Sequence, residues 1–198
     1  MRYRLTIWQN KTNFIWLVIL VLFATNGCSD DIPVPRPFGY FRIDLPEHSY
    51  ISSGISCPFE FKYARESLLL KKDTSLCWYN IYYPRLKATI YLTYIPVNND
   101  LNVHIDETQQ LTYEHQVKAT KIDRLPIAIK ESRVFGLMYK LKGDVASATQ
   151  FYVTDSTHHY LRGSLYFNAT VNTDSILPVL NYINQDIDTL IHSLKWMP

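Results

Sequence analysis

Residues 150–168, QFYVTDSTHHYLRGSLYFN, decide the fold of this chain. Apolar and polar residues alternate on both sides of a polar break at residues 155–158. Before the break, Phe151 and Val153 share one face, and the segment after it repeats the pattern. Two alternating segments around a short polar turn are typical of a β-hairpin. The stretch therefore predicts a long hairpin at the centre of a sheet.

Alternating segments elsewhere in the chain predict further strands. Pro126 interrupts one of them, which indicates an edge position or a bulge. The segment SLLLKKDTS, residues 67–75, is predicted to be a loop or a short helical turn. The predicted strands are FRIDL (41–45), CPFEFKY (57–63), WYNIYY (78–83), KATIYLTYI (87–95), KIDRLPIAIK (121–130) and RVFGLMYKLKG (133–143).

The period changes to that of a helix at residues 100–118, where an apolar stripe includes Leu101, Ile105 and Leu111. The histidines in this segment do not form a ligand pair on one face, so they are interpreted as solvated or boundary residues.

A second helix is predicted from Ile176 to Leu194, where apolar residues recur at steps of four and three. With Ser175 as its N-cap, Pro178 would occupy N3, where its missing N–H is tolerated. Packing on the sheet explains this stripe better than a coiled coil, and Trp196 is expected to close the margin of the core.

These elements predict a single α+β domain over residues 40–198. Its sheet is mainly antiparallel, with one inserted helix and one C-terminal helix packed on it. The order of elements is similar to that of the PsbP and Mog1 type of fold, an analogy of pattern only.

The N-terminus predicts export from the cytoplasm. Basic residues precede the apolar run FIWLVILVLFA, residues 14–24. As a helix this run rises about 16 Å, roughly half of a ~30 Å hydrocarbon core, which is typical of a signal peptide. Gly27-Cys28 follows where a lipoprotein signal peptidase acts, so residues 1–27 are the predicted signal peptide.

Cys28 is the predicted site of lipidation, which would attach acyl chains such as palmitate. Thr25 and Asn26 depart from the usual lipoprotein pattern, and an uncleaved membrane anchor is the alternative. Residues 28–39 contain three prolines and no hydrophobic periodicity, as expected of a stiff tether. The predicted location is the cell envelope, with the domain anchored to a membrane and facing the periplasm or in the outer membrane.

Cys57 and Cys77 lie beyond the predicted signal peptide, in a compartment where disulfides persist. A bond that closes a loop of about 20 residues would stabilise the fold by roughly 3 kcal/mol. The spacing favours a disulfide over two buried thiols. Neither cysteine has a nearby histidine in sequence, so a catalytic role is not indicated.

Composition excludes nucleic acid as a partner. The chain has 198 residues and a net charge of +2, but its first 27 residues carry three basic residues and no acid. The remaining 17 basic and 18 acidic residues leave a nearly neutral domain. Nucleic acids require clustered Lys and Arg, which this domain lacks.

The clearest candidates for chemistry lie in the hairpin turn, at Asp155, His158 and His159. We expect a turn in which Asp155 and the following serine bond their own backbone. A metal or anion site and a catalytic site are the alternatives, but neighbours on a tight turn point apart. Arg162 and Arg42 are each expected to pair with an acid, such as Asp155 for the former.

The chain shows no glycine-rich phosphate loop, HExxH, CxxC or nucleophile elbow. No catalytic residue, metal or cofactor is therefore predicted, and no small-molecule substrate is expected.

Several long strings resemble the gliding motility lipoprotein GldD family of Bacteroidetes, in order over the whole predicted mature chain. The resemblance implies a cell-envelope lipoprotein that is required for gliding, is linked to the type IX secretion machinery and has no assigned catalysis. Only Cys28 carries over as a functional residue, in the role of the lipidated cysteine. The strings are PRPFGYFRIDLPEHSY (35–50), CPFEFKYA (57–64), CWYNIYYPRLKATIYLTYIP (77–96), LTYEHQVKA (111–119), QFYVTDSTHHYLRGSLYFNA (150–169) and SLKW (193–196).

Two functions follow as hypotheses. The first is an assembly or stabilising subunit that binds gliding and secretion proteins through an exposed sheet face or edge. The second is a small-ligand or metal-binding module, or an unrecognised hydrolase, centred on residues 155–162. Convergence of the turn side chains on a pocket would favour the second.

Overall fold

The structure is a computed structural model of the chain. It describes residues 44–73, 76–114, 119–143, 145–168 and 173–197, the first three residues of the last range by their backbone only. All of them belong to one compact unit. Residues 1–39, with Cys28, and Arg42 lie outside the described residues. The division into signal peptide, tether and domain therefore stays a prediction.

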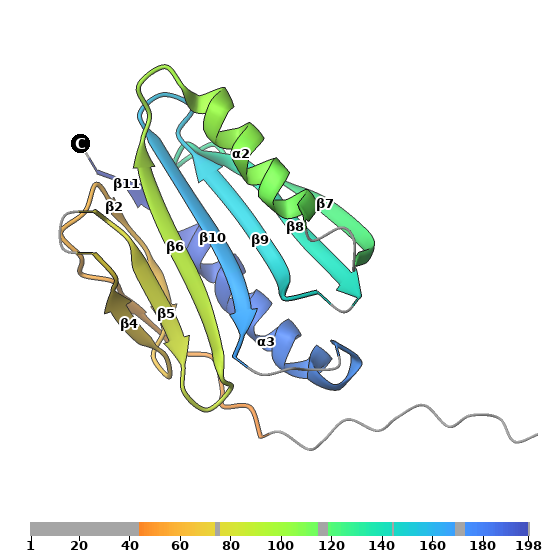
Figure 1. The fold of residues 1–198 in the computed structure, drawn as a ribbon. Coiled ribbons are helices and arrows are strands. Elements are labelled where there is room, and N and C mark those ends of the chain that lie inside the picture. The colour runs from red at the N-terminus through yellow and green to blue at the C-terminus, as the bar shows by residue number, and fades with distance from the viewer. Residues whose placement is uncertain (1–43, 74–75, 115–118, 144, 169–172, 198) are drawn as a thin grey trace, which may run out of the picture. The chain divides into compact units, whose positions relative to one another are not determined.

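A seven-stranded sheet forms the middle layer, with the order β4-β5-β6-β10-β9-β8-β7. All neighbouring strands in it are antiparallel, and the predicted hairpin lies at its centre (Figure 1). The strands are β4 (Leu68–Lys71), β5 (Tyr79–Tyr83), β6 (Ala88–Pro96), β7 (Ala119–Ile129), β8 (Val134–Gly143), β9 (Ser147–Thr154) and β10 (His159–Phe167).

The central hairpin β9–β10 follows the alternation in its sequence, and every residue of β9 is buried. Phe151 pairs with Gly163 across the two strands. A Cβ at Gly163 would come within 2.2 Å of the Phe151 ring, so glycine makes room for a phenyl group at the centre of the sheet.

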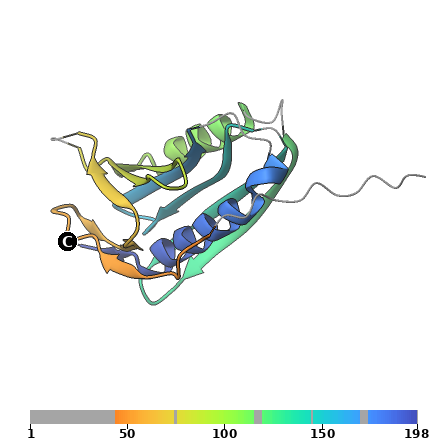
Figure 2. The ribbon, with the colours of Figure 1, turned by 90° about the horizontal axis from the view of Figure 1, so that it is seen from below.

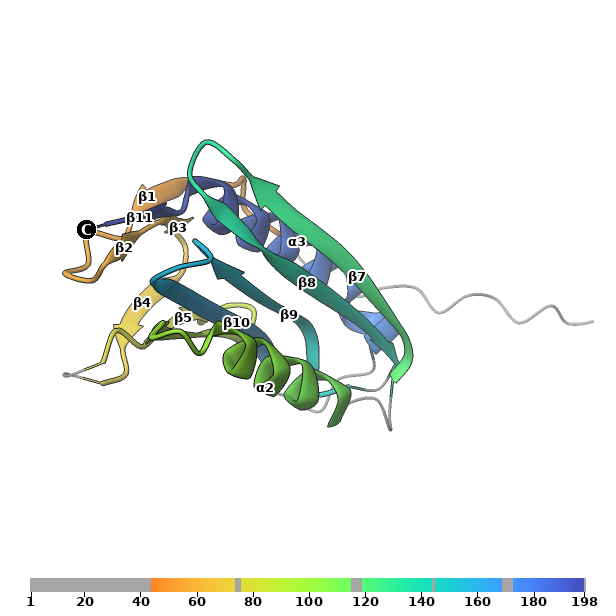
Figure 3. The same ribbon diagram turned by 90° about the horizontal axis from the view of Figure 1, so that it is seen from above.

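Helices cover the sheet from both sides, as Figures 2 and 3 show. Helix α3 (Thr173–Ser193) packs on one face, where its stripe residues Ile183, Ile187 and Leu190 are at most 1% exposed in the main core. Helix α2 (Leu101–Glu114) lies on the other face, over β9 and β10. The predicted α+β class, with an inserted and a C-terminal helix, is confirmed. The similarity to the PsbP and Mog1 type of fold stays a prediction.

Two small sheets lie on the same side as α3 (Figure 3). Each consists of two short antiparallel strands; in one sheet the strands are close in sequence, and in the other they are far apart. One of them brings the C-terminal Trp196 against Phe59, at the margin of the main core. The pairs are β1 (Tyr50–Ser52) with β3 (Lys62–Ala64), and β2 (Phe59–Glu60) with β11 (Lys195–Trp196).

Three strand predictions need correction. Asp44 and Leu45 are not in a strand, since the first described strand begins at Tyr50. The segment CPFEFKY is divided at Phe61 into strands that join different small sheets. The segment SLLLKKDTS contains β4 and is neither a loop nor a helical turn. Its apolar residues do not alternate with polar ones because an edge strand exposes Leu on one face and packs Leu on the other.

Both helices also differ in detail from their predictions. Helix α3 begins at Thr173, so Ser175 lies inside it and Pro178 lies beyond N3. In α2, Leu111 is 41% exposed and Thr112 is fully buried instead. The helix is rotated about its axis because the Thr112 hydroxyl donates a hydrogen bond to a side chain of the sheet. Within the described ranges, neither helix is long and apolar enough to cross a membrane.

Candidate interaction face

The turn between β9 and β10 is organised by the carboxylate of Asp155. Its Oδ1 accepts hydrogen bonds from the backbone N–H groups of Thr157, His158 and His159 at 2.8 to 2.9 Å, and its Oδ2 accepts one from the Thr157 hydroxyl at 2.7 Å. Burial would raise the pKa of this carboxyl, but the four hydrogen bonds outweigh burial and hold the pKa well below its usual range. The predicted self-bonded turn at Asp155 is confirmed, whereas Ser156 contributes its backbone N–H, which bonds the Thr154 hydroxyl.

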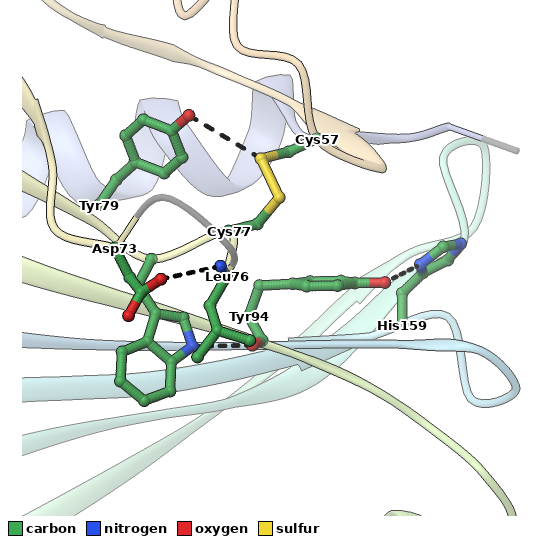
Figure 4. Close-up of a disulfide and its surroundings, with 8 residues drawn as sticks. Cys57, Asp73, Leu76, Cys77, Tyr79, Tyr94 and His159 are labelled. Carbon is green, nitrogen blue, oxygen red and sulfur yellow. Dashed lines mark hydrogen bonds between the residues drawn. A yellow bond between two sulfur atoms is a disulfide. The ribbon is translucent and has the colours of Figure 1, made fainter.

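The two adjacent histidines point in different directions. The side chain of His158 is 79% exposed. The ring of His159 instead stacks on Trp196, with centroids 5.1 Å apart, and its Nδ1 lies 2.9 Å from the Tyr94 hydroxyl (Figure 4). Burial lowers the pKa of His159, so its packed ring favours the neutral form. Among the described residues, no group of three or more His, Cys, Asp or Glu could hold a metal ion.

Arg162 does not take part in the turn at Asp155. On β10 it pairs with Thr93 of β6 and Tyr152 of β9, and it points to the same face as Tyr166. Burial raises the pKa of Tyr166, and the guanidinium of Arg162 opposes this effect. The expected ion pair with Asp155 is wrong: that carboxylate is used by its own turn, and no ion pair joins the two described side chains.

Cys57 and Cys77 are joined by a disulfide (Figure 4). Cys57 precedes β2, and Cys77 precedes β5, so the bond ties a small sheet to the seven-stranded sheet. Both cysteines pack against the main core, and the Tyr79 hydroxyl lies 3.9 Å from Cys57 Sγ. As a disulfide, the pair offers no thiolate for catalysis or metal binding.

The sequence analysis missed a polar cluster around Asp186, a 2% exposed residue of α3. Its Oδ1 lies 2.7 Å from His48 Nδ1 and accepts a hydrogen bond from the Tyr50 hydroxyl at 3.0 Å. Its Oδ2 accepts one from the Tyr83 hydroxyl at 3.0 Å. Burial, followed by the charge of Asp186, raises the pKa of Tyr83. In the sequence, this cluster is indicated only by the position of Asp186, three residues after Ile183 on the apolar stripe of α3.

A small pocket lies beside this cluster, where β5 turns into β6. Its polar lining includes the side chains of Glu66, Tyr83 and Arg85. Neither a nucleophile with an adjacent base nor the turn residues Asp155 and His159 line it. The pocket and the turn therefore do not form one catalytic site.

A further candidate site is a part of the sheet that neither described helix covers. Cross-strand pairs place Leu68 beside Tyr82, and Thr89 joins Tyr82 to Tyr166 on the same face. This is the face on which α2 lies, but Figure 1 shows α2 in front of the strands on the other side of β10 and no helix in front of β4, β5 and β6. We call this region the open face; it comprises Leu68, Leu70, Tyr82, Tyr91, Arg162 and Tyr166.

Side chains of the open face are large and accessible. Leu68, Leu70 and Tyr91 are 51%, 47% and 41% exposed. The rings of Tyr91 and Tyr166 meet edge to face, with centroids 5.6 Å apart. This arrangement supplies a broad apolar surface with hydroxyl groups and one guanidinium, which suits binding of another macromolecule.

The family described as gliding motility lipoprotein GldD matches residues 30–196. No curated protein matches the chain. The family match covers every strand and both helices described above.

Proposed function

Since this chain belongs to the gliding motility lipoprotein GldD family, we propose that it is an assembly or stabilising component linked to the type IX secretion and gliding machinery. Proteins of this kind are anchored to a membrane of the cell envelope by acyl chains. In this proposal Cys28 carries the chains, and the domain of residues 40–198 binds gliding and secretion proteins. The protein then acts by binding and not by catalysis.

The observation that carries the proposal is the open face. Binding energy at protein interfaces is concentrated in Tyr, Trp and Arg, surrounded by apolar contacts. The open face combines three tyrosines, one arginine and two exposed leucines on an antiparallel sheet. A rigid sheet fixes these side chains before binding, which lowers the entropic cost of association.

The alternative of a ligand, metal or hydrolase site at residues 155–162 gains no support from the side chains. Asp155 binds its own turn, His158 points to solvent and His159 stacks on Trp196. Arg162 lies on the open face and contributes to the binding surface in this proposal.

The proposal is tested by Tyr91→Asp in the native bacterium. Burying a carboxylate in an apolar interface is costly, so we expect gliding and the levels of partner envelope proteins to fall strongly. The protein itself should accumulate normally, because Tyr91 is 41% exposed and its loss leaves the core intact. The readouts are spreading on a surface and quantitative proteomics of the envelope.

A matched control is Leu177→Asp, which places the same charge at a 39% exposed position on α3, away from the open face. This strain should glide normally. Normal gliding and unchanged protein levels in the Tyr91→Asp strain would contradict the proposed role of the open face.

A further inference from the structure

The two edges of the seven-stranded sheet differ in how they are protected. Edge strand β7 carries Pro126 and the exposed charges Lys121 and Arg124, devices that discourage pairing with another strand. Edge strand β4 is four residues long and carries the exposed Lys71, but it has no proline and exposes Leu68 and Leu70. An edge without proline that presents apolar side chains is suited to strand addition.

The backbone of β4 is oriented for such pairing. The N–H of Lys72 donates to the Trp78 carbonyl at 2.9 Å, so Lys72 faces β5. Backbone direction alternates along a strand, and Leu70 therefore also faces β5. Leu69 and Lys71 then direct their N–H and C=O groups outward, beyond the last strand of the sheet.

The sequence around Leu69 is complementary to itself in the antiparallel direction. Pairing two copies about Leu69 sets Leu68 of each beside Leu70 of the other. Parallel pairing in register would instead set the lysines beside each other, which is destabilising.

We propose that the protein forms a homodimer in which the β4 strands of two copies pair antiparallel about Leu69. The two Leu69 residues exchange N–H and C=O hydrogen bonds at the two-fold axis. On either side, the Lys71 N–H of one copy donates to the Ser67 carbonyl of the other. The two seven-stranded sheets become one continuous sheet.

The symmetry gives the dimer a property that one copy lacks. A two-fold axis normal to the sheet keeps the open faces of both copies on the same side. Leu68 and Leu70 then join the two open faces across the axis. Two identical binding surfaces side by side raise the avidity for a repeated partner. The proposed dimer is independent of the proposed function, and the experiments below measure cross-linking and not gliding.

Cross-linking of introduced cysteines in the native cell envelope tests the register of the proposed β4–β4 pair. Cells that co-express Leu68→Cys and Leu70→Cys copies with different tags should form a disulfide-linked dimer that contains both tags. The two positions face each other at a close, non-hydrogen-bonded pair of the proposed ladder. Leu125→Cys, at a 42% exposed leucine on β7, is the matched control and should remain monomeric. Absence of the mixed dimer, or an equal yield from Leu125→Cys, would overturn the proposal.

A second substitution separates pairing from folding. In the cross-linking strain, Lys71→Pro removes the outward N–H without touching the bonds to β5, whereas Lys71→Ala removes the same charge and keeps the N–H. Lys71→Pro should lower the cross-linked fraction by about tenfold relative to Lys71→Ala, since each dimer loses two hydrogen bonds. Equal yields would show that β4 does not pair in this way.

Discussion

At the scale of single residues, one carboxylate holds the central hairpin. Asp155 accepts three backbone N–H groups and one hydroxyl at the sharp reversal between the two central strands. Arg133, in the turn between β7 and β8, also donates to its backbone carbonyl at 3.4 Å. Asp155 and His159 are therefore held in place by hydrogen bonds and stacking within the fold, whereas the His158 side chain is exposed.

We expect Asp155→Ala to lower the free energy of unfolding by about 2 to 4 kcal/mol, because three backbone donors lose their acceptor. Denaturant unfolding of the purified protein measures this loss. Asp188→Ala, at an exposed position on α3, is the control and should change stability by less than about 0.5 kcal/mol.

The contribution of Asp155 to the free energy of unfolding also depends on pH. Its pKa is lower in the folded protein than in the unfolded chain, so its stabilisation is complete above the ordinary pKa of about 4 and is lost as the pH falls below that value. The difference in stability between the wild type and Asp155→Asn should shrink as the pH is lowered from about 5 to 2. A constant difference would contradict the role of the charge.

The Asp186 cluster could not be predicted from the sequence. The sequence shows an acid on the apolar stripe of α3, but its partners His48 and Tyr83 lie 138 and 103 residues away. Local periodicity cannot supply such pairs, because they depend on how the chain returns to the same place. The turn at Asp155 could be predicted since all the partners of its carboxylate lie within four residues.

At the scale of elements, both helices pack apolar residues on the sheet, but Leu101 and Ile105 of α2 are only partly buried, against a second and smaller cluster. The stripe of α3 buries Ile183, Ile187 and Leu190 almost completely in the main core. The buried residues of α2 are Thr108 and Thr112, which bond Tyr160 and Gln150 of the sheet through their hydroxyl groups. Apolar burial contributes more than such neutral hydrogen bonds.

Hydrogen exchange should therefore separate the helices. We expect the amides of α2 to exchange at least about tenfold faster than those in the middle of α3, because α2 can detach without opening the main core. Mass spectrometry of peptides from 101–114 and 180–190 measures this difference. Equal protection would mean that α2 opens only with the whole domain.

Elements with one buried face were predictable, and β4 was not. The hairpin, β5, β6 and β8 show alternation because one or both faces are packed in a regular way. In β4, Leu68 and Leu70 are exposed although they are apolar, so hydrophobicity does not report burial there. A strand that exposes apolar side chains breaks the pattern on which its prediction depends.

At the scale of the whole molecule, the disulfide joins a small sheet to the seven-stranded sheet. Cys57 leads into β2 of a small sheet, and Cys77 leads into β5 of the seven-stranded sheet, with a sequence separation of 20 residues. The bond holds these sheets together on one side of the domain. It also fixes the segment that contains edge strand β4.

Reduction of the disulfide should lower the free energy of unfolding by roughly 3 kcal/mol, the entropic value for a loop of this length. Thermal unfolding with and without reductant measures the shift in Tm. The Cys57→Ser/Cys77→Ser variant is the control, and reductant should leave its Tm unchanged. An equal Tm of the wild-type protein with and without reductant would contradict the stabilising role of the disulfide.

The Asp186 cluster has a mechanical consequence if Cys28 anchors the protein, as proposed. A pull along the tether would enter the described domain at Asp44 and meet His48 and Tyr50, both bound to the same carboxylate on α3. The load would then be shared between the three-residue ladder of β1 with β3, which begins at Tyr50, and the helix that fills the core. The buried Asp186 thus links the anchored end of the domain to its core, so that a pull from the membrane side would be resisted by the core.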